Sequence, residues 1–203
     1  MTRALTLLVV IASLSAQPAQ AYLHLTSSTG LTQTPLKWNQ TRVRWFATDR
    51  GVPGVTASQF QAAVAAGFAT WEAVPTASVT FQFVGFTSAL PFDDDTISTF
   101  GFDAQPDLDR VLGATSFVVD TLTGDIVESD VFFNSIFTWS TAAAGDATRF
   151  DLQSVATHEI GHFIGLGHSA IGETEIRPDG GRRVLASGAV MFPISLGRGV
   201  TSD

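Results

Sequence analysis

Three histidines and one glutamate lie within eleven consecutive residues and could bind and use a metal ion. His158 and His162 are four residues apart, so on a helix they share one face and can reach the same ion. Glu159 lies about 100° round the helix from His158, where it can reach a water on the metal rather than act as a third ligand. The pattern therefore predicts a helix that carries two metal ligands and a general base.

The third histidine, His168, can join the other two only if the helix ends. Six residues beyond His162 correspond to about 9 Å along a helix axis, whereas two imidazole nitrogens on one zinc ion lie within about 4 Å of each other. Gly165 stands where a left-handed residue would end a helix without steric cost, and Gly167 loosens the turn further. Three neutral imidazoles with one open position are typical of a catalytic zinc site.

Chance is the competing explanation for this pattern. A short His-Glu-x-x-His motif arises by chance on ordinary helices. However, three histidines, one glutamate and one glycine at these fixed positions arise by chance in roughly one chain in 100,000 of this size. We therefore expect His158, His162 and His168 to bind one catalytic zinc ion, with Glu159 as the catalytic base.

Residues 158–169, HEIGHFIGLGHS, resemble the HExxHxxGxxH motif of the metzincin metalloproteases. Ser169, directly after the third histidine, resembles the residue at that position in the matrixins, the family that contains the matrix metalloproteases. The segment AVMFP at residues 189–193 resembles the methionine turn of the metzincins. The resemblance implies that Met191 and Gly165 give structural support, with Met191 packed beneath the imidazoles and not bound to the metal.

The resemblance implies an α+β fold of the metzincin type. Such a domain has a twisted, mostly parallel sheet of about five strands with an antiparallel edge strand, a long active-site helix and the methionine turn. β-prone segments predict strands at 41–47, 78–86, 96–100, 110–118 and 126–133. Apolar spacing predicts a helix at 57–73, with Thr56 and Gln59 as a capping box, and a second helix at about 152–165 with Asp151 as its N-cap.

An edge strand above the zinc binds the substrate of matrixins by strand addition, through main-chain hydrogen bonds. Leu112, Gly113, Ala114 and Thr115 are similar to that strand and are the candidate substrate-binding residues. The family's Pro-x-Tyr pocket wall is replaced here by the sequence PIS at residues 193–195, which lacks the aromatic residue.

Other metal sites are less clearly indicated. Many animal matrixins bind a structural zinc ion through histidines near the positions of Thr115 and at Phe132, which are not histidines here. We therefore expect a single zinc ion. Clustered carboxylates at 93–95 and 103–109 could bind Ca²⁺, but they show no regular calcium-loop spacing. Simple solvated turns are the alternative, and no calcium ligands are assigned.

Composition and the N-terminus bear on where the protein acts. Residues 1–21 have a positive start at Arg3, an apolar run at 5–14 and a small-x-small cleavage site that ends at Ala21, which predicts a secretory signal peptide. A short membrane anchor is the alternative. Removal of the signal peptide leaves 10 basic and 19 acidic residues. A protein with this negative net charge binds nucleic acid poorly. We expect a monomer, soluble after signal cleavage, that is secreted, extracellular or periplasmic.

Residues 22–203 are expected to form one metzincin-like domain, since this length fits a single core. The chain ends at Asp203, where the family's last helix would begin, so we expect that helix to be missing or truncated. The polar segment 170–188 is either a rim near the active site or a tolerated surface insertion.

The expected function is that of a secreted zinc endopeptidase that hydrolyses peptide bonds of proteins, through a zinc-activated water and Glu159 as general base. The alternative is a catalytically weak peptide-binding module with a metzincin fold, because the pocket wall and the last helix differ from the family.

Overall fold

A computed structural model describes residues 23–169, 174–176, 178, 182–184 and 189–192. The expected signal peptide, the segment 193–195 and the chain's C-terminal residues lie outside the described residues.

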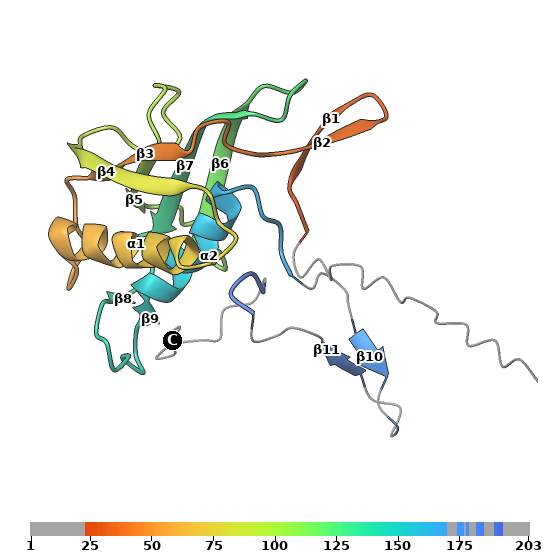
Figure 1. The fold of residues 1–203 in the computed structure, drawn as a ribbon. Coiled ribbons are helices and arrows are strands. Elements are labelled where there is room, and N and C mark those ends of the chain that lie inside the picture. The colour runs from red at the N-terminus through yellow and green to blue at the C-terminus, as the bar shows by residue number, and fades with distance from the viewer. Residues whose placement is uncertain (1–22, 170–173, 177, 179–181, 185–188, 193–203) are drawn as a thin grey trace, which may run out of the picture.

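A five-stranded sheet forms the centre of the fold (Figure 1). Its strands are β3 (Arg42–Thr48), β4 (Thr80–Thr87), β5 (Thr99–Asp103), β6 (Gly113–Val119) and β7 (Ile126–Asn134). They lie in the order β4-β3-β5-β7-β6, and only β6, at one edge, runs antiparallel to its neighbour. This arrangement confirms the expected mostly parallel sheet with an antiparallel edge strand.

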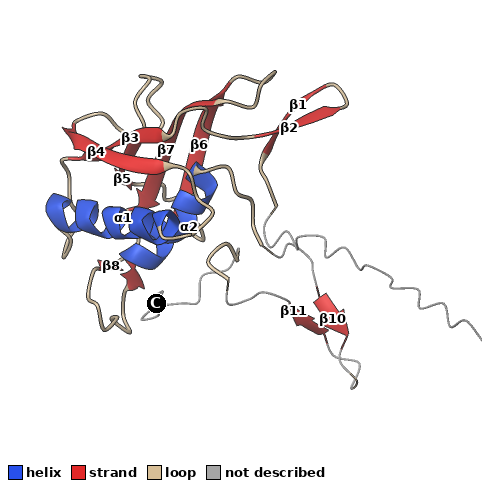
Figure 2. Cartoon of the chain, viewed as in Figure 1, coloured by secondary structure: helices blue, strands red, loops and turns tan. Residues whose placement is uncertain are grey.

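Two helices, α1 (Ala57–Glu72) and α2 (Leu152–Phe163), cover one face of this sheet (Figures 1 and 2). The expected capping box of α1 is present, because the Thr56 hydroxyl accepts from Gln59 N and the Gln59 side chain accepts from Thr56 N. The Asp151 carboxylate caps α2 by accepting from Ser154 N at 2.7 Å. The predicted helix at 152–165 is two residues longer than α2.

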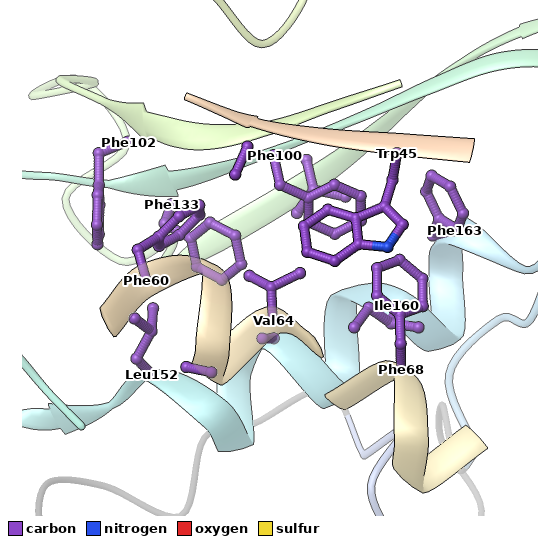
Figure 3. Packing of buried hydrophobic residues seen from close by; sticks show 14 of the residues in the cluster. Trp45, Phe60, Val64, Phe68, Phe100, Phe102, Phe133, Leu152, Ile160 and Phe163 are labelled. Carbon is purple, nitrogen blue, oxygen red and sulfur yellow. The ribbon is translucent and has the colours of Figure 1, made fainter. Parts of the chain in front are cut away.

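Aromatic side chains fill the space between the sheet and the helices (Figure 3). Trp45 of β3 lies with its ring centroid 5.0 Å from that of Phe68 of α1, and Phe68 lies 5.6 Å from Phe163 of α2. Burial of each such side chain contributes roughly 1.5–3 kcal/mol. The indole of Trp71 also donates to Thr157 O at 2.8 Å, which joins the two helices directly. This core fixes α2 relative to the sheet.

The structure departs from the sequence prediction along the segment before β5. The predicted strand at 96–100 begins only at Thr99, because Thr96 has a positive φ of 67° that interrupts extended backbone. The loop that precedes β5 is held on the outer face of β7 instead. There Asp130 accepts from Thr99 N and Phe92 N, and Glu128 accepts from Thr96 N.

Three short strand pairs were not predicted. They are β1 (Thr26–Thr29) with β2 (Thr32–Pro35), β8 (Trp139–Ser140) with β9 (Phe150–Asp151), and β10 (Thr174–Ile176) with β11 (Arg182–Val184). The hairpin of β1 and β2 lies in a polar segment that is exposed on most sides, so no apolar alternation marked it. Neither helix in the described part of the chain has the length and hydrophobicity to cross a membrane.

Candidate metal centre

The three motif histidines converge on one point. His168 Nε2 lies 3.2 Å from His158 Nε2 and 3.2 Å from His162 Nε2. Nitrogens that share a tetrahedral zinc ion, each with a bond of about 2.0–2.1 Å, lie about 3.4 Å apart. The observed spacing therefore fits one zinc ion. Among the described residues, this is the one group of histidines and carboxylates close enough to hold a metal ion.

Backbone carbonyls orient two of the imidazoles. His158 Nδ1 lies 2.6 Å from Val190 O, and His162 Nδ1 lies 2.8 Å from Leu166 O. A carbonyl oxygen can only accept, so the network assigns the proton of each ring to Nδ1. Each Nε2 then directs its lone pair toward the common point, which is the tautomer that a metal ligand needs.

All three imidazoles favour the neutral form. Burial lowers the pKa of His158 and of His168, and lowers the pKa of His162 to about 4. For His162 the neighbouring imidazoles lower the pKa further, while the hydrogen bond to Leu166 O opposes the shift. Neutral rings at neutral pH are the form that binds zinc.

The helix ends after Phe163, and Gly165 makes the reversal that brings His168 back. Gly165 has a φ of +93°, and its N–H donates to His162 O at 2.7 Å. A Cβ at this position would also overlap Leu36 O. The expectation that a left-handed Gly165 ends the helix is confirmed.

The N-terminal segment holds this reversal from outside. Leu25 N donates to Gly165 O at 2.9 Å, and Gly167 N donates to Leu23 O at 2.5 Å. His24, between them, forms a β-bridge with Leu166. Residues 23–25 therefore pair with the turn that carries His168, a contact that the sequence did not indicate.

The methionine turn packs against the motif helix. Met191 is fully buried, and its carbonyl accepts from Ser169 N at 2.8 Å. A Cβ on Gly161 would overlap the Met191 sulfur, so the thioether lies directly against the helix backbone. The neighbouring Val190 carbonyl contacts His158. These contacts support the expected structural role of Met191.

Glu159 is 5% exposed, directly follows His158 on α2 and contacts β6. Thr115 Oγ1 donates to Glu159 Oε2 at 2.9 Å. Burial raises the pKa of Glu159 to about 7, and the hydrogen bond from Thr115 opposes that rise. A carboxyl group with this pKa can both accept and donate a proton near neutral pH.

The candidate substrate residues lie at the edge of the sheet. Leu112 immediately precedes β6, and Gly113, Ala114 and Thr115 begin it. The sequence had suggested only main-chain roles for these residues. The hydrogen bond from Thr115 to Glu159 was missed, because a threonine 44 residues from a glutamate carries no local signal of contact.

At the positions of the structural zinc site and in the acidic loop, the side chains make other contacts. Phe132 is buried, with its ring centroid 5.2 Å from that of Phe92. In the acidic loop, Asp103 accepts from Ala104 N and from the Gln105 side chain. The calcium ligands stay unassigned.

The loop before β6 is organised by Asn134, which sequence reasoning also missed. Its Nδ2 lies 3.0 Å from Gln105 O, 3.0 Å from Leu108 O and 3.2 Å from Val111 O. Its Oδ1 accepts from Gln105 N at 3.1 Å. One buried amide thus ties this loop to the end of β7.

The mostly parallel sheet with its antiparallel edge, the motif helix and the three-histidine centre are consistent with a metzincin fold. A sequence model of the matrixin family matches residues 37–178, which include all three histidines and Glu159. The chain belongs to the matrixin family.

Two curated plant proteins are similar to this chain. Metalloendoproteinase 2-MMP of Arabidopsis thaliana is 33% identical over 105 residues, 47% of this chain and 26% of the plant protein. Metalloendoproteinase 1 of Glycine max is 59% identical over 34 residues, 14% of this chain and 11% of the soybean protein. The matches thus span about a quarter or less of these relatives' length.

Proposed function

We propose that the chain is a zinc-dependent endopeptidase that hydrolyses peptide bonds of proteins. One observation carries this proposal: His168 Nε2 lies 3.2 Å from the Nε2 atoms of both His158 and His162, and the buried Glu159 directly follows His158 on the same helix. The matrixin family match and the names of the plant relatives support the same activity.

His158, His162 and His168 would hold the zinc ion. When bound, zinc supplies Lewis-acid chemistry, because it polarises a carbonyl group and lowers the pKa of a water molecule toward about 7. Glu159 is the general base in this proposal. It takes the proton from the attacking water and then delivers it to the leaving amine.

The free edge of β6 is the proposed substrate site. β6 pairs with β7 on one side, and no strand in the described part of the chain covers its other side. An extended peptide can add to such an edge through main-chain hydrogen bonds. Leu112, Gly113, Ala114 and Thr115 line this edge, and those of them whose peptide groups face away from β7 would make those bonds.

We also propose that the protein is exported, on the basis of its sequence. The features of residues 1–21 suit a secretory signal peptide, so the domain would act outside the cytoplasm as a soluble monomer. Secretion of the full chain with an N-terminus at Tyr22 would support this, and retention of residues 1–21 would oppose it.

The testing experiment is cleavage of unfolded casein by the purified protein, with zinc content measured on the same sample. We expect one zinc ion per chain, cleavage that a chelator abolishes, and loss of cleavage in Glu159→Gln with zinc retained. Asp49→Asn, which removes an exposed carboxylate, is the charge-matched control.

Two other outcomes would contradict the proposal. Zinc binding without cleavage by the wild-type protein would favour the peptide-binding module, which binds peptides equally well with or without the Glu159 carboxylate. Absence of zinc from the purified protein and from protein titrated with zinc would mean that the three imidazoles do not form a metal site.

A further inference from the structure

We infer that Thr115 is a positioning residue for Glu159: its hydroxyl group and the absent side chain of Gly113 together orient the carboxylate of the base. This inference rests on the proposed function and assigns to the edge strand a role beyond substrate binding.

The hydroxyl group of Thr115 holds one oxygen of the carboxylate. Thr115 Oγ1 lies 2.9 Å from Glu159 Oε2 and 3.2 Å from the Glu159 carbonyl oxygen. It has one proton, and a charged carboxylate is the stronger acceptor as well as the nearer one. The other oxygen, Oε1, accepts no hydrogen bond from the described residues. One oxygen is therefore fixed, and the other is left for a water molecule.

Gly113 borders the free oxygen. It lies two residues before Thr115, so both positions face α2 from the same side of β6. A Cβ on Gly113 would lie 3.3 Å from Glu159 Oε1, 3.2 Å from Glu159 Cγ and 2.9 Å from Phe132 O. Any side chain here would displace either the carboxylate or the strand. Gly113 and Thr115 thus lie against the two oxygens of the same carboxyl group.

The main chain of the same two residues faces the free edge of the sheet. Asn134 N donates to Leu112 O at 2.8 Å, which makes Leu112 and Asn134 a hydrogen-bonded pair of the β6–β7 ladder. In an antiparallel pair these positions alternate. The peptide groups of Leu112 and Ala114 therefore face β7, and those of Gly113 and Thr115 face outward, where a substrate strand would pair.

Thr115 can therefore contact the substrate and the base at the same time. Its main chain is available to an added peptide, and its side chain holds the base that acts on that peptide. A shift of β6 would move the substrate and the base together, so their relative geometry is preserved. This geometry matters because misplacement of a catalytic group by about 1 Å can cost about 100-fold in rate.

The test compares Thr115→Val with Thr115→Ser. Valine keeps the shape but lacks the donor, and serine keeps the donor. We expect Thr115→Val to lower kcat by about 10- to 100-fold with KM changed less than about twofold, and Thr115→Ser to retain kcat within about threefold. Gly113→Ala should also lower kcat. Thr32→Val, at an exposed position on β2, is the matched control.

Crystal structures of the zinc-loaded wild type and variants give a readout that does not depend on turnover. The carboxylate of Glu159 should keep its rotamer in Thr115→Ser and leave it in Thr115→Val. An unmoved carboxylate, or a valine variant with wild-type kcat, would overturn the inference. Absence of activity in the wild-type protein would contradict the proposed function. The crystal structures would still decide whether Thr115 orients Glu159. Zinc content of each variant separates these effects from loss of folding.

Discussion

The sulfur of Met191 lies directly against the backbone of Gly161, with no room for a methyl group between them. Gly161 is inside the motif helix, between Glu159 and His162. The turn that carries Met191 also supplies Val190 O, which contacts His158 Nδ1 at 2.6 Å. Close packing of Met191 on Gly161 therefore fixes the carbonyl that orients the His158 imidazole.

Replacement of Gly161 by alanine should weaken zinc binding. The added methyl group would push Met191 outward and lengthen the hydrogen bond to His158, and loss of such a partner typically costs about 10- to 100-fold in metal affinity. Zinc affinity can be measured by competition with a chelator. Met191→Ala opens the space, so the double variant should bind zinc more tightly than Gly161→Ala alone. A double variant no tighter than Gly161→Ala would show that the contact is not the cause.

Removal of one backbone donor in the N-terminal segment should also affect the metal centre. Leu25 N donates to Gly165 O, in the turn that brings His168 to the other histidines. Leu25→Pro removes this donor, so we expect a lower thermal stability and a zinc affinity reduced by about 10-fold, the effect of losing one hydrogen bond of about 1–1.5 kcal/mol.

Leu25→Ala is the matched control for that variant, because it shortens the side chain and keeps the N–H group. Equal zinc affinity in Leu25→Pro and Leu25→Ala would mean that pairing of residues 23–25 with the turn does not support the metal site.

The convergence of the three histidines was predictable because their geometry is local. His158, His162 and His168 are joined by ten peptide units, and helix geometry together with zinc–nitrogen bond lengths leaves few ways to bring them to one ion. The same holds for the caps, since Thr56 and Gln59 lie three residues apart. The sheet was predictable in its strand segments and, through the resemblance, in its mostly parallel arrangement with an antiparallel edge strand.

Contacts between distant segments were not predictable in this way. Thr115 meets Glu159 only because β6 and α2 pack together. The β1–β2 hairpin has no apolar buried face, because its buried and half-buried positions are Ser27 and Thr34. No alternation of apolar and polar residues therefore marks it in the sequence. Asn134 is the last residue of a buried strand and carries no local signal of its role, yet its amide is a buried centre of five hydrogen bonds.

Asn134→Asp should destabilise the protein strongly. The Nδ2 group donates toward three carbonyl oxygens, and a carboxylate would place a negatively charged oxygen against all of them. Buried polar groups left without partners cost about 1–3 kcal/mol each, so we expect a loss of at least about 3 kcal/mol. Urea unfolding at neutral pH measures this loss.

Gln33→Glu makes the same chemical change at an exposed position on β2 and should alter the stability by less than about 0.5 kcal/mol. A similar small effect for Asn134→Asp would show that the amide does not organise the loop before β6.

The buried carboxylate of Asp130 should make the stability depend on pH. Burial raises the pKa of Asp130 from 3.8 to about 7, the nearby carboxylates of Glu128 and Asp95 add to the rise, and hydrogen bonds from Thr99 N and Phe92 N oppose it. Between pH 4 and 7 the folded state therefore binds more protons at this position than the unfolded state. The contribution of Asp130 to stability is greatest below about pH 4 and falls as the pH rises to about 7.

Asp130→Asn removes this titration and isolates its effect. The free energy of unfolding of both proteins can be measured in urea from pH 5 to 8. The difference between the variant and the wild type should increase with pH, by at most about 1.4 kcal/mol per pH unit, and should level off above pH 7. The histidines titrate equally in both proteins, so their contribution cancels in the difference. Asp49→Asn removes an exposed carboxylate and should follow the wild type within about 0.5 kcal/mol. A difference for Asp130→Asn that is constant with pH would mean that Asp130 is ionised throughout, held in that form by its two backbone donors.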